Sequence, residues 1–371
     1  MKKVRKLIVR LFLLILILLI ISLQIPGTFG NKKANSNYDF VLSESITNMD
    51  ARIVDIGVLG SHDAFSDGIT YSSKPNSNEG GITNNKIVNT IGKGLVVRMS
   101  KAQMVGAKDQ LNAGVRYFDV RITKIDNEYY TCHGYLSNTL DIYLKEIVEF
   151  LDNHPGEYVI FDIQHFYANN HEVGDQDKEE FTLLLTYIES VKSNSGKSLI
   201  DYVNYNPQAD NISTLTYGKI TSNKATAGVI MLGYVHDNNV LYFRDGDANY
   251  NKKDYENIFS LWHQTNSTTD LISGIEEEVT YLKDSDYLNI LRVNQAQRTG
   301  FMMNAKLVKS LCSWSIINMA KSTNKELVKD KTRFLKYLEV MPIFMVDYST
   351  SNVGNFNELA NTYIALYNKN L

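Results

Sequence analysis

The stretch Ile53-Val54-Asp55-Ile56-Gly57-Val58-Leu59-Gly60-Ser61-His62-Asp63 is an apolar run of strand length that ends in polar side chains. Similar runs recur along the chain and are rich in Val, Ile, Tyr and Phe, the residues that favour strands. We expect eight strands, at Ile53–Leu59, Val115–Ile122, Tyr129–Cys132, Tyr158–Ile163, Gly228–Tyr234, Ile258–Trp262, Leu288–Val293 and Val340–Val346. Helix patterns lie between several of them, at Thr139–Asn153, Lys178–Lys192, Lys306–Ala320 and Glu358–Tyr367.

This alternation predicts an α/β fold, a distorted (βα)8 TIM-type barrel with parallel strands and incomplete helical cover. The cover is expected to be incomplete because Ala64–Lys101 is rich in Ser, Asn and Gly and is typical of a loop. In addition, Tyr117–His133 is predicted to form two strands joined by the Asp126-Asn127 turn.

The composition excludes several classes of protein. The chain has 371 residues, of which 44% are apolar, so it can bury a large core. Five of its 38 basic residues and none of its 41 acidic residues lie in the first thirty positions. The remainder is therefore acidic, which argues against a nucleic-acid partner.

The N-terminus has the layout of a secretory signal peptide. Basic residues end at Arg10, and Leu11–Leu23 is apolar except for Ser22, which is short for a membrane span. We expect a signal peptide at 1–30, a polar leader at 31–44 and a single catalytic domain at 45–371, in a secreted, extracellular protein. The alternative is an uncleaved anchor. Cys132 and Cys312 are expected to be buried free thiols.

Polar side chains follow most of the predicted strands. In a parallel barrel the catalytic residues project from the carboxyl ends of the strands. The candidates that carry chemistry are His62, Asp63, Arg121, His133 and Asp347. Two histidines can hold opposite protonation states near neutral pH, a carboxylate can orient each one, and arginine matches phosphate oxygens. This set indicates cleavage of a phosphodiester by a neighbouring hydroxyl.

Four segments together resemble bacterial phosphatidylinositol-specific phospholipase C. They are Gly60-Ser61-His62-Asp63-Ala64, Gly114–Arg121, Cys132-His133-Gly134 and Val346-Asp347-Tyr348. The resemblance implies cleavage of phosphatidylinositol to diacylglycerol and inositol 1,2-cyclic phosphate.

It also implies a role for each site residue. His62 would be the general base, oriented by Asp347, and His133 the general acid, paired with Asp63. Arg121 would bind the phosphate, with Asp119 supporting the network. No cofactor and no metal are expected, because metal-dependent relatives have an acidic calcium ligand at the position of Arg121.

One difference from the bacterial enzymes bears on which lipid headgroup is recognised. The bacterial enzymes have a lysine after the strand at which this chain has Gln164 and His165. We expect Gln164, His165, Tyr234 and Asp119 to bind substrate. The headgroup preference stays open.

The expected partner is phosphatidylinositol at a membrane surface, met in transient contact by a monomer. Two alternatives stay open. One is a metal-dependent glycerophosphodiesterase or sphingomyelinase-like barrel enzyme, and the other is a non-catalytic inositol-lipid binding protein.

Overall fold

The computed structural model describes residues 2–24, 40–252, 254–300 and 315–371. The strands are β1 (Val58–Ser61), β2 (Val115–Ile125), β3 (Glu128–His133), β4 (Tyr135–Thr139), β5 (Tyr158–Ala168), β6 (His171–Glu172), β7 (Gly228–Gly233), β8 (Leu241–Phe243), β9 (Ile258–Ser260), β10 (Leu291–Gln295) and β11 (Ile343–Val346). The α-helices are α1 (Lys2–Gln24), α2 (Lys93–Ser100), α3 (Ala107–Asn112), α4 (Leu140–Asn153), α5 (Lys178–Ser190), α6 (Tyr217–Ile220), α7 (Thr268–Leu282), α9 (Ile316–Leu327), α10 (Lys331–Val340) and α11 (Phe356–Asn368).

The central sheet is a curled parallel barrel. Its strands follow the order β8-β7-β5-β2-β1-β11-β10-β9, and every neighbouring pair is parallel. Among the described residues, β8 and β9 share no ladder. They meet through the isolated bridge between Ala248 and Leu261 and through a hydrogen bond from Asn257 Nδ2 to Phe243 O of 3.1 Å. The barrel therefore has a seam between β8 and β9.

Alternate side chains along each barrel strand pack into two different cores. Ile160, Ile230, Val293 and Met345 belong to the cluster that fills the barrel interior. Their strand neighbours point outward into the larger cluster between the sheet and the helices. This alternation is the period-two pattern of a strand that is buried on both faces.

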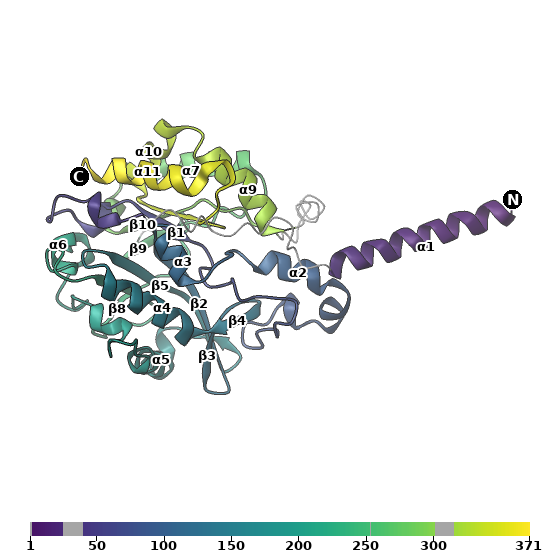
Figure 1. Ribbon diagram of the computed structural model, residues 1–371, viewed down its shortest axis with the longest axis horizontal. Coiled ribbons are helices and arrows are strands. Elements are labelled where there is room, and N and C mark those ends of the chain that lie inside the picture. The colour runs from purple at the N-terminus through teal and green to yellow at the C-terminus, as the bar shows by residue number, and fades with distance from the viewer. Residues whose placement is uncertain (1, 25–39, 253, 301–314) are drawn as a thin grey trace.

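Helices cover the barrel unevenly (Figure 1). In this view α7, α9, α10 and α11 lie on one side and α3, α4 and α5 on the other. No α-helix lies between β7 and β8 or between β8 and β9 in the part of the chain that the structure describes. The predicted TIM-type barrel with incomplete helical cover is therefore confirmed.

Several predicted boundaries were wrong, for local reasons. Ile53–Asp55 forms a 3-10 turn, so the first strand begins only at Val58, and Asp286–Asn289 is another such turn ahead of β10. Val340 ends α10, because Pro342 follows and the residue before a proline disfavours helix. The predicted helix Lys306–Ala320 falls partly on residues 301–314, outside the described residues, and α9 runs on to Leu327.

The segment predicted as a loop at Ala64–Lys101 contains helical structure. A π-helical turn at Val88–Gly92 leads into α2, and α1 contacts both of them and projects from the body next to α2 (Figure 1). None of the described helices combines the length and the apolar character needed to cross a membrane. Cys132 is buried, as predicted, and Cys312 lies outside the described residues.

Candidate active site

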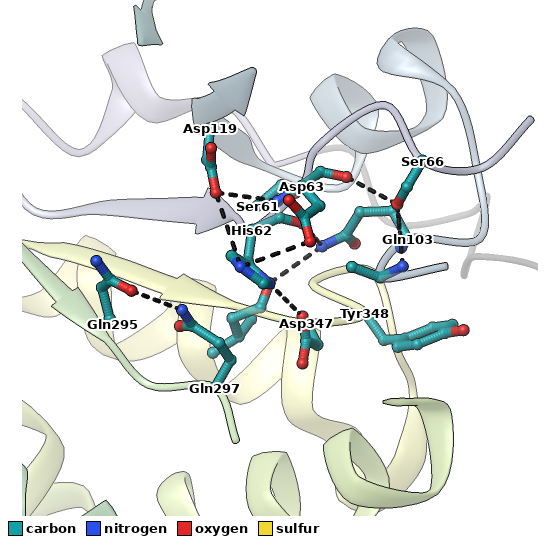
Figure 2. Close-up of polar contacts among 12 residues, drawn as sticks. Ser61, His62, Asp63, Ser66, Gln103, Asp119, Gln295, Gln297, Asp347 and Tyr348 are labelled. Carbon is teal, nitrogen blue, oxygen red and sulfur yellow. Dashed lines mark hydrogen bonds and ion pairs between the residues drawn. The ribbon is translucent and has the colours of Figure 1, made fainter. Parts of the chain in front are cut away.

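The base candidate, His62, and its carboxylate partner come from neighbouring parallel strands. His62 follows β1, and its backbone N–H donates to Val346 O at 3.1 Å, the last residue of β11. Asp347 follows β11, and its Oδ1 lies 2.7 Å from His62 Nδ1 (Figure 2). A carboxylate can only accept here, so Nδ1 carries the proton and neutral His62 presents a lone pair at Nε2.

Asp63 is the hub of the site. Its φ of +43° lies in the left-handed region, which is rare outside glycine, and this turn directs the side chain beneath His62. The side chain is fully buried and forms ion pairs with Arg121 Nε and, at 2.9 Å, with His133 Nδ1. Asp63 Oδ2 also lies 3.6 Å from His62 Nε2. One carboxylate therefore contacts all three cationic groups of the site.

Arg121 lies two residues after Asp119 on β2, so the two side chains point to the same side of the strand. The bulge beside it belongs to β5: Val120 pairs with Ile163 and Arg121 with His165, which leaves Gln164 as the extra residue. Arg121 Nη2 lies 3.4 Å from His62 Nε2. Asp119, two residues earlier, accepts a hydrogen bond of 3.1 Å from the Asp63 backbone N–H. The guanidinium is thus held next to the nitrogen of His62 that would accept a proton.

The acid candidate, His133, is carried by a hairpin outside the barrel ladder. β2 extends to Ile125, and Asp126 and Asn127, both with positive φ, form the predicted turn into the antiparallel strand β3. His133 ends β3, and its Nδ1 lies 3.0 Å from Ser100 O as well as close to Asp63. Both partners are acceptors, so Nδ1 carries a proton and Nε2 is the nitrogen that can exchange one. The centroids of the two imidazole rings are 6.4 Å apart.

Burial and charge compete in setting the proton affinities. Burial lowers the pKa of His62, but the charges of Asp63 and Asp347 outweigh it and raise that pKa to about 9. The pKa of His133 is also raised, because Asp63 outweighs burial.

The carboxylates respond differently. Burial would raise the pKa of Asp63, yet Arg121 and His133 hold it well below its usual range. Burial dominates at Asp347 and raises its pKa. With a pKa of about 9, His62 is charged near neutral pH in the free site, and it must give up a proton before it can act as a base.

These side chains open into a cavity of about 420 Å³. His62, Arg121, His133 and Asp347 line it, and the further described lining residues are Met99, Gln164, His165, Tyr167, Asp247, Trp262, Gln295, Gln297, Arg298, Thr299, Gly300 and Ile316. Its size and its mixture of polar and apolar walls are those of a small-molecule site.

The predicted substrate-binding residues differ in their placement. Gln164 and His165 line the cavity, and His165 Nδ1 lies 2.6 Å from Glu172 Oε1. Asp119 is buried beneath the site. Tyr234 is not among the described residues of the lining; its hydroxyl accepts a hydrogen bond of 3.0 Å from the buried Arg244. The structure therefore does not bring Tyr234 to this cavity with the other predicted substrate-binding residues.

Among the residues that the structure describes, one group of ligand atoms could hold a metal ion. His62, Asp63 and Asp119 each offer one such atom, and these atoms lie within 4.8 Å of one another. Both oxygens of Asp63 already contact Arg121 or His133, so an ion there would compete with the guanidinium. The donor set fits a cation poorly while Arg121 is in place.

Sequence reasoning missed several residues of the site. Gln103, in the middle of a Ser- and Asn-rich region, donates from Nε2 to His62 O at 2.9 Å and to Val346 O at 3.1 Å (Figure 2). Trp262, Gln297 and Arg298 line the cavity from the far side. Nothing in the local sequence marks Gln103. The position of Arg298 just after a predicted strand was a usable signal.

Part of the chain is similar in sequence to known proteins. A family model described as PI-PLC X 1 matches residues 91–191, which include Arg121 and His133. Human PI-PLC X domain-containing protein 3 is 35% identical over 122 residues, which make up 31% of this chain and 38% of that protein. The variant-surface-glycoprotein phospholipase C of Trypanosoma cruzi is 27% identical over 128 residues, 32% of this chain and 34% of that protein. The match thus spans between about a third and two fifths of these curated relatives.

Solved structures extend the likeness to nearly the whole fold. A mutant of phosphatidylinositol-specific phospholipase C from Staphylococcus aureus superposes with a TM-score of 0.57 at 16% identity, covering 90% of this chain and 99% of that one. The enzyme from Listeria monocytogenes gives 0.53 at 16% identity, covering 88% and 98%. At this identity the likeness concerns the fold alone. Taken together, residues 91–191 are similar to the PI-PLC X domain, and the chain as a whole has the barrel fold of the bacterial phosphatidylinositol-specific phospholipases C.

Proposed function

We propose that the protein is a phosphatidylinositol phosphodiesterase of the phospholipase C type that works as a phosphorus–oxygen lyase. The observation that carries the proposal is the placement of two imidazoles, 6.4 Å apart, with Arg121 beside one and Asp63 bridging all three. An intramolecular phosphoryl transfer requires a general base, a general acid and a cation that binds the phosphate, all at the same cavity.

The reaction balances with these residues alone. His62 Nε2 takes the proton of the inositol 2-hydroxyl, and that oxygen attacks phosphorus to form the cyclic diester. The bond from phosphorus to the glycerol oxygen breaks, and His133 Nε2 gives that oxygen a proton. Arg121 stabilises the charge on the phosphate oxygens. The products are diacylglycerol and inositol 1,2-cyclic phosphate, and the proton gained by His62 replaces the one lost by His133 through solvent.

The decisive experiment is phosphorus NMR of the product formed from phosphatidylinositol. A five-membered cyclic phosphate that appears with the wild type, and not with His62→Ala or His133→Ala, supports the mechanism. Lipid binding without any cyclic product would contradict it and favour the non-catalytic inositol-lipid binding protein.

A metal-dependent diesterase is the second candidate, because His62, Asp63 and Asp119 bring three ligand atoms within 4.8 Å. In such an enzyme, a chelator removes activity and a divalent cation restores it. We expect activity to survive chelation, because Arg121 supplies the positive charge at this position.

We further propose that the segment 80–108 faces the membrane. It contains five basic residues and no acidic one, and Ile82, Ile87 and Ile91 are 46%, 70% and 44% exposed. Apolar side chains flanked by cations suit an anionic lipid surface. The segment adjoins the site, because Met99 lines the cavity and Ser100 contacts His133.

The test is co-sedimentation with vesicles of phosphatidylcholine and phosphatidylglycerol. Ile87→Glu and Ile91→Glu should each weaken binding several-fold, whereas Ile142→Glu, at a position on α4 that is about as exposed as Ile91, should not. Equal binding by all three variants would refute this orientation.

For localisation, we propose export by the signal peptide at 1–30. The motivation is the basic, apolar and small-residue layout of this segment. Mass spectrometry of the protein from culture medium should give a mature N-terminus near residue 31. Recovery only in the membrane fraction, with the N-terminal segment intact, would favour the anchor.

A further inference from the structure

The two imidazoles of the site are carried by different parts of the fold, but they share one support. His62 follows β1 of the barrel, and His133 ends β3 of the hairpin. Ser100 ends α2, and Ser100 O accepts a hydrogen bond of 3.0 Å from His133 Nδ1. Gln103 lies just beyond it, and Gln103 Nε2 donates to His62 O at 2.9 Å. The segment 100–103 therefore contacts both groups of the proposed proton transfer.

The side-chain amide of Gln103 uses all of its hydrogen-bonding capacity. Its Nε2 donates to His62 O and, at 3.1 Å, to Val346 O (Figure 2). Its Oε1 accepts from Ser349 N at 3.1 Å and from Ser349 Oγ at 3.2 Å. Two donors and two acceptors are what an amide offers, and Gln103 is fully buried. This one side chain thus joins the end of β1 to the end of β11.

The two carbonyl groups held by Gln103 belong to the peptide groups next to the site carboxylates. His62 O lies in the peptide group that leads into Asp63, and Val346 O lies in the one that leads into Asp347. Asp63 has a φ of +43°, a conformation that costs energy and persists only where the surrounding contacts hold it. The paired register of β1 and β11 ends at Ser61 and Val346, so the sheet itself does not supply those contacts.

The backbone of the segment is itself fixed on two sides. Ser66 Oγ accepts from Ala102 N at 3.0 Å and from Gln103 N at 3.1 Å. The same hydroxyl donates to Asp63 O at 2.8 Å (Figure 2). On the other side, Tyr348 N donates to Ala102 O at 2.8 Å. The segment is therefore bound both to the turn after β1 and to the turn after β11.

We propose that Gln103 is a positioning residue for both histidines of the reaction. Its amide holds the turn of His62 and Asp63 against Asp347, and its backbone links that turn to the support of His133. The inference rests on the proposed function. Gln103 is not among the described residues that line the cavity, so it acts through the histidines and not by contact with the lipid. A displacement of reacting groups by about 1 Å can cost about 10²-fold in rate, which gives such a support its importance.

The experiment compares Gln103→Met with the wild type on phosphatidylinositol in detergent micelles. Methionine has a similar size but cannot hold the two carbonyl groups, so kcat should fall by about ten- to hundred-fold. KM should stay within about two-fold, because Gln103 does not contact the lipid. This split between kcat and KM is one that a loss of folded protein would not produce.

Asn368→Leu is the matched control. Asn368 is another buried amide that holds the backbone of the β1 segment, since its Nδ2 donates to Gly57 O at 2.9 Å and its Oδ1 accepts from Gly57 N at 2.8 Å. Gly57 precedes β1, whereas His62 follows it, so this amide lies at the other end of the strand. Both variants should unfold at lower urea concentration, but only Gln103→Met should lower kcat.

A spectroscopic measurement separates this inference from the proposed function. The proton between His62 Nδ1 and Asp347 lies in a short, charge-assisted hydrogen bond and should give a low-field proton resonance in protein labelled with ¹⁵N-histidine. Asp347→Asn supplies the reference spectrum. The resonance should stay in Asn368→Leu and should broaden or move upfield in Gln103→Met. That result supports the positioning role even if no lipid is cleaved.

Three results would overturn the inference. The first is a folded Gln103→Met protein with the kcat and the low-field resonance of the wild type. The second is a raised KM at unchanged kcat, which would assign Gln103 to lipid binding, and the third is an equal loss of kcat in Asn368→Leu.

Ser66→Ala gives a second route if Gln103→Met does not fold. It removes the hydroxyl that fixes the segment to Asp63 O and keeps the Gln103 amide. We expect kcat to fall by about three- to ten-fold at unchanged KM, with a broadened His62 resonance. An unchanged kcat together with an unchanged resonance would overturn the inference here too.

Discussion

Replacing Asp347 with Asn tests the assignment of His62 as the general base. The carboxylate lies 2.7 Å from His62 Nδ1 and is one of three that raise the pKa of this histidine from 6.5 to about 9. Loss of an opposite charge at this distance shifts a pKa by about one to three units. The pKa of His62 should therefore fall to between about 6 and 8 in Asp347→Asn.

Two measurable effects follow from this shift. The base must be neutral, so activity rises with pH as His62 loses its proton, and this ascending limb should move to lower pH by the same one to three units. The plateau should drop by about 10²- to 10⁴-fold, because an amide holds neither the correct tautomer nor the imidazolium as a carboxylate does. That loss corresponds to about 3–5 kcal/mol of transition-state stabilisation.

The assay is kcat/KM on phosphatidylinositol micelles across the pH range, with the cyclic product followed by phosphorus NMR. Asp245→Asn is a suitable control, because Asp245 pairs with Lys252 and is not among the described lining residues. An ascending limb that stays in place in Asp347→Asn, or a plateau within about three-fold of the wild type, would refute the reasoning.

Three further outcomes are expected. His133→Ala should lose about 10²- to 10⁴-fold on phosphatidylinositol but far less on an inositol phosphodiester with a nitrophenol leaving group, which needs no proton; equal losses would exclude His133 as the acid. Arg121→Lys should lower kcat by about 10²-fold or more, because an ammonium cannot reproduce the fork that contacts Asp63 and faces His62; near-normal kcat would exclude a charge-stabilising role. Protonated His62 should stabilise the fold by about 3 kcal/mol below pH 6.5, and this contribution should disappear as the pH rises through about 9, so urea unfolding of His62→Asn should show a smaller loss over that range than the wild type.

The sequence carried enough information to predict the part of the site that lies at the ends of adjacent strands. His62 and Asp347 follow β1 and β11, which are parallel neighbours, so the side chains after them had to meet. Arg121 and Asp119 lie one strand period apart on β2 and reach the same side. Periodicity and chain direction determine these positions.

The rest depended on tertiary contacts that leave no local pattern. His133 reaches the cavity only because β2 is long enough to fold back as a hairpin beyond the ladder. Gln103 comes from an irregular segment, where polar residues are common and spacing predicts no direction. The helix α2 was missed because it follows a π-helical turn in a region rich in Asn and Gly.

The hairpin of β2 and β3 places the two histidines of the proposed proton transfer on supports of unequal rigidity. His62 sits on the ring of parallel strands, whereas His133 is attached to an arm that projects past it and is steadied by Ser100 and Asp63. In the proposed mechanism, local unfolding of this hairpin would move His133 away from the leaving group. The residues of the barrel that contact the headgroup would stay in place. A reversible loosening of a few residues could thus silence turnover without expelling the lipid, and amide exchange in β3 would report it.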